Sequence, residues 1–139
     1  MTNFDEYRDV FVVADTIDDV VHPVTYELIG QARRIAKELG QLVQVMLLGE
    51  NVQAEAEELV AHGADIVHVF ESPLLKYYTT DGYTKVLTDF FEDHKPNILL
   101  IGATNNGRDL APRMSGRMQN GVVADCTILT VDTEEGLVE

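Results

Sequence analysis

The sequence has one cysteine, few basic residues and no long apolar run, and each shortage excludes a class of protein. The single thiol, Cys126, allows no internal disulfide and favours a reducing compartment. Ten lysines and arginines face 24 aspartates and glutamates, and the net charge of −14 disfavours binding to nucleic acid or anionic membranes. No run approaches the ~18 apolar residues of a membrane helix, and residues 1–8 lack the apolar core of a signal peptide. We therefore expect a cytoplasmic protein with no nucleic acid partner and no membrane insertion.

Strand-like and helix-like patterns alternate along the chain. Residues 10–14 form a continuous apolar run, typical of a strand buried on both faces of a parallel sheet. Similar runs predict further strands over residues 42–48, 66–70, 98–101 and 122–131, and residues 137–138 begin another. Helical spacing predicts helices between Pro23 and Gly40, between Asn51 and Gly63, around residues 83–91 and around residues 110–118. This order predicts one α/β domain, a three-layer sandwich with a mostly parallel sheet flanked by helices. The sheet would be open, as in adenine-nucleotide hydrolases or flavodoxins, with residues 98–101 near its centre.

Short local signals mark the ends of these elements. Pro23 is expected at the first position of a helix, where a missing N–H costs nothing, and Gly40 as its left-handed C-cap. Asn51 is expected to cap the second helix. Residues 15–19, which include three aspartates, are expected to form a loop of solvated carboxylates, because they lack the glycine of a calcium loop.

The two turns that would bind a nucleotide lack the required residues. A dinucleotide fold places glycines after its first strand, whereas the first glycine of this chain is Gly30, inside a predicted helix. Gly102 and Gly107 have the spacing of a phosphate-binding P-loop, but Arg108 and Asp109 replace its Lys and Ser or Thr. The sequence therefore argues against both a Rossmann hydride-transfer site and a nucleotide hydrolase.

Residues 102–109 leave two interpretations open. Gly107 could adopt a positive φ, and Asp109 near a helix start would be favoured by the macrodipole, which describes a capped turn with surface arginines. Alternatively, the loop and Arg113 form a partner-binding edge, because ligands of such folds bind at the carboxyl ends of the strands.

Metal and nucleophile chemistry have little support. The four histidines are scattered, without a second ligand at metal spacing. Cys126 lies in an apolar stretch, which predicts a buried, unreactive thiol. Ser72 and Ser115 lack the glycines of a nucleophile elbow. The tyrosines at positions 26, 77, 78 and 83 could stack on a flavin or a partner, but at helical spacing or next to Pro73 they are expected to complete the core. We predict no catalytic and no metal-binding residues.

Several stretches together resemble the electron-transfer flavoprotein alpha subunits. The most specific is residues 95–129, because a generic α/β domain has no reason to carry all of its pieces. The matching pieces are residues 27–40, 47–49, 63–65, Tyr78-Thr79 with Tyr83, 102–104, 107–113 and 124–127. Asn105-Asn106 and Val122-Val123 differ from the commoner choices of that family, which bears on the subfamily only.

The resemblance implies a function for the whole protein. Such a subunit pairs with a beta subunit of similar fold and carries electrons through an FAD, from dehydrogenases to a quinone reductase or another acceptor. It implies that residues 1–139 are the N-terminal α/β domain and that the FAD is held mainly by a C-terminal domain that they do not include. No cofactor-binding residue is therefore expected here, and the fragment alone should be redox-inactive. The candidate contacts with the beta subunit are Thr104, Asn105, Arg108 and Arg113.

An alternative function shares the predicted fold. A universal-stress-type adenine-nucleotide-binding module would need a glycine-rich phosphate loop ending in small hydroxyl residues, where this chain has Arg108-Asp109. An ATP-pyrophosphatase-like enzyme would need a serine- and glycine-rich loop after the first strand, where this chain has Ala14-Asp15-Thr16. Both requirements are unmet in the sequence.

Overall fold

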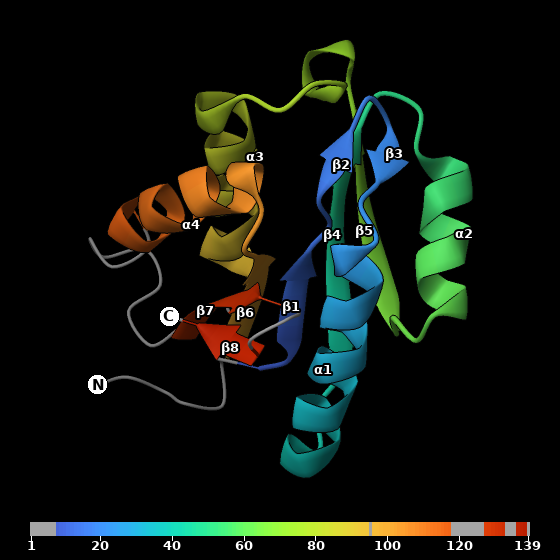
Figure 1. Ribbon diagram of the computed structural model, residues 1–139, viewed down its shortest axis with the longest axis vertical. Coiled ribbons are helices and arrows are strands. Elements are labelled where there is room, and N and C mark those ends of the chain that lie inside the picture. Colours follow the sequence, from blue (N-terminus) through green and yellow to red (C-terminus); the bar gives the residue numbers. More distant parts are fainter. Residues whose placement is uncertain (1–7, 95, 118–126, 133–135, 139) are drawn as a thin grey trace.

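A six-stranded sheet forms the middle layer of the molecule (Figure 1). The computed structural model describes residues 8–94, 96–117, 127–132 and 136–138. The strand order is β5-β4-β1-β6-β7-β8, parallel throughout except that β8 runs antiparallel to β7. The strands are β1 (Val10–Val13), β4 (Val43–Gly49), β5 (Ile66–Glu71), β6 (Ile98–Gly102), β7 (Thr127–Asp132) and β8 (Gly136–Val138). This confirms the predicted α/β class and the inner position of residues 98–101.

Helices cover both faces of the sheet (Figure 1). The helices are α1 (Val24–Leu39), α2 (Gln53–Ala61), α3 (Thr80–Asp93) and α4 (Asn105–Arg117). Side chains alternate across β1, because Val10 and Val12 pack with α1 whereas Phe11 and Val13 pack with α3 and α4. All four are buried, which explains the continuous apolar run of this strand.

Two signals at the ends of α1 have the predicted effect. Pro23 lies directly before the first helical residue, and the ring of His22 accepts a hydrogen bond from the Val24 N–H. Gly40 closes the helix at φ 66°, and its N–H points to the carbonyls of Ala36 and Lys37. The left-handed backbone explains the glycine at this position.

The acidic segment after β1 is a hairpin, which corrects the prediction of a solvated loop. Two short strands, β2 (Thr16–Ile17) and β3 (Val20–Val21), pair antiparallel. Asp18 and Asp19 form the turn at φ 52° and 63°, the two positive values that a tight type I′ hairpin requires. The Asp19 carboxylate accepts hydrogen bonds from the N–H groups of Glu50 (2.8 Å) and Asn51 (3.1 Å).

The predicted cap of α2 is also wrong. Val52, and not Asn51, holds the cap position, and no side chain within the helix start caps it. Carboxylates distant in sequence satisfy this turn instead. Glu71 accepts from the Val52 N–H (2.9 Å), and Asp19 accepts from the two residues before it. Two hydrogen bonds to the Glu71 carboxylate lower its pKa. The bond from the Gln53 side-chain amide contributes most, and the bond from the Val52 N–H contributes next.

The stretch that follows β6 is shorter than predicted. Helix α4 begins at Asn105, so Gly107 lies in its first turn and not in a loop. Its φ is not positive, which corrects the first interpretation of this residue. The predicted strand over residues 122–131 is observed from Thr127 to Asp132, whereas Cys126 and residues 118–125 lie outside the described residues.

Candidate functional site: the carboxyl edge of the sheet

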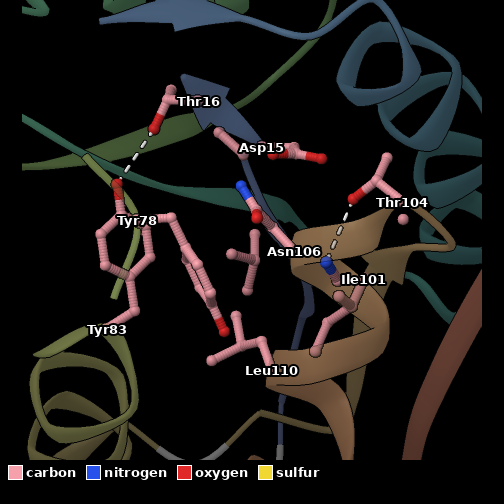
Figure 2. A pocket seen from close by; sticks show the side chains of 12 residues that line it. Asp15, Thr16, Tyr78, Tyr83, Ile101, Thr104, Asn106 and Leu110 are labelled. Atoms are coloured by element: carbon pink, nitrogen blue, oxygen red, sulfur yellow. Dashed lines mark hydrogen bonds between the residues drawn. The ribbon is translucent and has the colours of Figure 1, made fainter. Parts of the chain in front are cut away.

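Successive strands are added on one side of β1 first and then on the other side, so the strand order reverses between β1 and β6. From β1 it proceeds outward to β4 and β5, and it then returns to β6 and proceeds outward to β7 on the other side. The crevice outside the carboxyl ends of β1 and β6 is therefore the switch point where open α/β sheets usually bind ligands. Residues of β1, β2, β6 and α4 line it, together with Tyr78 and Tyr83 (Figure 2).

Buried hydroxyl groups fill the floor of this crevice. Tyr83 is 3% exposed, and its hydroxyl donates to the Leu75 carbonyl (3.0 Å) and lies 3.2 Å from the Thr16 hydroxyl. Thr16 in turn donates to the Leu48 carbonyl (2.8 Å). Burial raises the pKa of Tyr83, so this hydroxyl stays a neutral donor at ordinary pH. Figure 2 shows Thr16 and Tyr83 meeting above the end of β1.

The remaining space is too small for a nucleotide or a flavin. The crevice leaves about 20 Å³ for the centres of water-sized molecules, which is room for roughly one water. Drug-sized and cofactor-sized ligands occupy pockets of ~300–1,000 Å³. Tyr83, Tyr78 and Leu110 are among the side chains that line this small space. The residues at this switch point therefore do not fit an FAD or an adenine nucleotide.

Tyr78 connects the edge of the crevice to α4. Its hydroxyl donates to Asp109 Oδ2 (2.7 Å), and the Thr80 hydroxyl donates to the same oxygen. Burial, followed by the bond to Asp109, raises the pKa of Tyr78 to about 12. The bonds from Thr80 and Tyr78 lower the pKa of Asp109. Asp109 therefore acts as a charged acceptor that holds the segment before α3 against α4, beyond the helix-start role predicted for it.

The first turn of α4 lies against the end of β6. Thr104 Oγ1 accepts from the Gly107 N–H (3.1 Å), and the Thr104 carbonyl accepts from the Arg108 N–H (2.8 Å) (Figure 2). A Cβ on Gly107 would overlap the carbonyl oxygen of Gly102. Gly107 is thus required by close approach of two backbones, and not by its φ angle.

The four candidate partner contacts divide into two places. Thr104, Asn105 and Arg108 share the start of α4, where Thr104 is half-buried and the other two are exposed. Arg113 lies more than one turn further along and forms an ion pair with Asp81 of α3 (2.7 Å). Asp81 and Arg113 are both exposed, so this pair contributes little to stability.

The histidines occupy structural positions in the described part of the chain. His68 and His94 lie 6.0 Å apart between ring centroids and pack on Phe90. His62 packs on Tyr26. Within the described residues, no three His, Cys, Asp or Glu side chains are grouped as metal ligands, and no helix is long and apolar enough to cross a membrane.

Together, the fold and the crevice define an open α/β domain of the nucleotide-binding type whose switch point is closed by its own side chains. Comparison with known proteins gives the family. Residues 10–139 match the electron transfer flavoprotein domain, and the chain belongs to this family. It is 45% identical over 130 residues to the electron transfer flavoprotein subunit alpha of Megasphaera elsdenii, covering 94% of this chain and 38% of that protein.

A second relative and one solved structure complete the comparison. The chain is 45% identical over 133 residues to subunit LctC of the lactate dehydrogenase (NAD(+),ferredoxin) of Acetobacterium woodii, covering 96% of this chain and 32% of that protein. A universal stress protein in complex with cAMP superposes with a TM-score of 0.54 at 15% identity, covering 91% of this chain and 98% of that one. That likeness shows the fold alone. The chain thus spans 38% and 32% of the length of these two relatives.

Proposed function

We propose that residues 1–139 are the N-terminal domain of an electron transfer flavoprotein alpha subunit. The complete protein would be a cytoplasmic, FAD-containing carrier that pairs with a beta subunit and passes electrons from dehydrogenases to an acceptor. The observation that carries this proposal is the family match over residues 10–139, together with 45% identity to a relative of that name. In this role the domain shapes the subunit and docks a partner, and it does not itself react.

The closed crevice supports an FAD site elsewhere in the complete subunit. FAD, when bound, supplies the one- and two-electron chemistry of the carrier. The residues of this domain do not fit it at the switch point, because the space that Tyr78 and Tyr83 line there is too small. We therefore assign the flavin to a C-terminal domain beyond residue 139.

The start of α4 is our proposed contact with the beta subunit, through Thr104, Asn105, Arg108 and Arg113. Three features support this choice. The helix start is held rigidly against β6, its polar groups are exposed, and it lies at the edge of the sheet where such folds make contacts. The net charge of −14 would steer the domain toward a partner surface with basic residues.

Substituting the two arginines tests this interface. We expect Arg108→Ala with Arg113→Ala to weaken binding of the complete alpha subunit to its beta subunit by ~3- to 30-fold, the loss typical of two peripheral charges. Arg33→Ala with Arg34→Ala removes the same charge from α1 and is the matched control. Equal affinity of both double variants and the wild type in a titration by calorimetry would reject the proposed contact.

The universal-stress-type module stays an alternative on fold similarity alone. Denaturing the purified chain and recording the absorption spectrum of any released molecule separates the two functions. We expect no chromophore from residues 1–139. Released adenine without flavin would favour the nucleotide module, and released flavin would contradict our assignment of the FAD.

A further inference from the structure

The β2–β3 hairpin exposes one of its two apolar pairs to solvent. Thr16 and Val21 are directly opposite each other and buried, whereas Ile17 and Val20, the next pair, are 57% and 67% exposed. Directly opposed side chains on one face of a hairpin contact each other and form a single patch. Ile17 and Val20 therefore form a pair of adjacent exposed apolar side chains.

This hairpin is fixed in place. Its turn holds two non-glycine residues, Asp18 and Asp19, at positive φ, a conformation that persists only where the surrounding structure holds it. The Asp19 carboxylate fixes the turn to the N–H groups that follow β4, and the Thr16 hydroxyl fixes its other end to the Leu48 carbonyl. The exposed pair is therefore presented in one orientation, which lowers the entropy lost on docking.

A second exposed apolar pair belongs to a segment that an ion pair joins to the hairpin. The segment after β5, which contains the 3-10 turn η2 (Pro73–Leu75), exposes Leu74 (83%) and Tyr77 (60%). Between them, Lys76 reaches across to Asp18 of the hairpin (Nζ to Oδ1, 3.6 Å). Figure 1 shows the hairpin and this turn at the same end of the sheet, beyond the carboxyl ends of the strands. We call these four side chains the edge patch.

Acidic side chains surround the edge patch. Asp15, Asp18 and Asp19 belong to the hairpin, and Glu50 and Glu71 follow the neighbouring strands. Glu50 and Asp18 both lie near Lys76, and Asp19 lies near Glu71, close enough to affect their pKa values. One lysine faces this group of carboxylates, so the rim is negative. Its complement is a surface with an apolar centre and basic residues around it.

We propose that the edge patch, Ile17, Val20, Leu74 and Tyr77, docks such a surface on the beta subunit. The inference rests on the proposed heterodimer and extends its interface beyond α4. Tyr78, next to Tyr77, is hydrogen-bonded to Asp109 of α4, so the edge patch and the α4 contact lie around one edge of the sheet. The edge at which related folds hold a ligand would here hold a protein.

Substitutions that keep the fold test the edge patch in the complete alpha subunit. Ile17→Thr with Val20→Thr keeps the β-branched shape of the hairpin and removes its apolar surface. Leu74→Gln alters a side chain that is 83% exposed and therefore leaves folding intact. We expect each variant to weaken binding to the beta subunit by roughly tenfold or more, as central apolar contacts do. The matched control is Val60→Thr, an equally apolar and 52% exposed position on α2.

The outcomes separate this inference from the proposed function. Weaker binding by both variants with unchanged binding by Val60→Thr supports the edge patch. Wild-type binding that no variant weakens overturns the edge patch and leaves the heterodimer standing. A wild-type subunit that does not bind the beta subunit overturns both. If light scattering instead shows that the variants dissociate a homodimer of the alpha subunit, the edge patch binds a second copy of this chain and the proposal is wrong.

The acidic rim is tested by the association rate and its dependence on salt. Asp18→Asn with Glu50→Gln should lower the association rate at low salt and make it less dependent on ionic strength. Asn tolerates the left-handed backbone of position 18, so the hairpin is retained. An unchanged salt dependence would contradict the basic surface that we assign to the partner.

Discussion

Alanine at position 107 should destabilise the protein, although alanine normally favours a helix. The new Cβ would overlap the Gly102 carbonyl oxygen, with the Gly102 carbonyl carbon at 3.0 Å and Ile101 Cγ2 at 3.1 Å. The nearest of these atoms belong to the backbone, so the first turn of α4 must move away from β6. Such overpacking costs about 1–3 kcal/mol or more, against a gain of about 1 kcal/mol from helix propensity. We expect a net loss of about 1–2 kcal/mol.

Urea denaturation followed by circular dichroism measures this loss. With a slope of about 1–3 kcal/mol per molar, the midpoint should fall by roughly 0.3–2 M at an unchanged slope. Gly30→Ala is the matched control, because it lies inside α1 with nothing within 4 Å of the new Cβ. It should gain about 0.5–1 kcal/mol.

The opposite signs of the two substitutions make the test decisive. If Gly107→Ala unfolds at the same or a higher urea concentration than the wild type while Gly30→Ala gains stability, α4 does not approach β6 as described. The displaced helix start should also weaken binding to the beta subunit, because Thr104 and Arg108 move with it. If the Gly107→Ala variant is destabilised but binds the beta subunit with full affinity, this turn is not part of the interface.

Substitutions at three further positions test the contacts that hold the carboxyl edge and the opposite end of the sheet. Asp19→Ala should lose about 1–3 kcal/mol in urea denaturation, because it removes two backbone hydrogen bonds and places alanine at φ 63°. Asp19→Gly relieves the backbone conformation and should lose less. Tyr83→Phe should lose about 1–2 kcal/mol by the same measurement, because it removes the hydroxyl that bonds the Leu75 carbonyl. For His68, burial and then the neighbouring His94 lower the pKa from its ordinary 6.5, so the unfolded chain takes up this proton first. The free energy of unfolding should therefore fall as the pH drops below 6.5 and level off below the folded-state pKa, and His68→Gln should flatten that slope.

Each of these has a result that would contradict it. Equal losses for Asp19→Ala and Asp19→Gly would show that the turn backbone is not left-handed. A fully stable Tyr83→Phe variant would mean that its hydroxyl is hydrated and not bonded within the protein. A slope between pH 6.5 and 5 that His68→Gln leaves unchanged would assign the pH dependence to other groups.

Local patterns predicted most of the fold. The continuous apolar run of residues 10–14 specifies a strand covered on both faces, and β1 is such a strand, between β4 and β6. Gly40 marks the end of α1 because a left-handed C-cap is a local property of one residue. Such features depend on spacing of a few residues, so they can be recognised without the tertiary structure.

The features that were missed have two different causes, partners distant in sequence and an unusual local turn. Asn51 is a good capping residue, but Asp19 and Glu71 satisfy that turn from other parts of the chain. The hairpin at Asp18 and Asp19 lacks the usual Asn-Gly or Asp-Gly turn signal. The one local sign of the hairpin was that its apolar residues differ in exposure, since Ile17 is exposed and Val21 is buried.

The sequence by itself determined the α/β class, the inner place of residues 98–101 and the family, because these follow from hydrophobic patterns and from the residues that match relatives. Only the tertiary structure decided what the carboxyl edge can do. Tyr83 meets Thr16 across 67 positions of the chain, and their hydroxyls close the crevice where related folds bind nucleotides. Gly107 is small because Gly102 lies against it, and an ion pair between Lys76 and Asp18 joins the segment after β5 to the hairpin. Spatial neighbours of this kind leave no periodic trace in a single sequence, since the packing that joins them is set by the whole sheet.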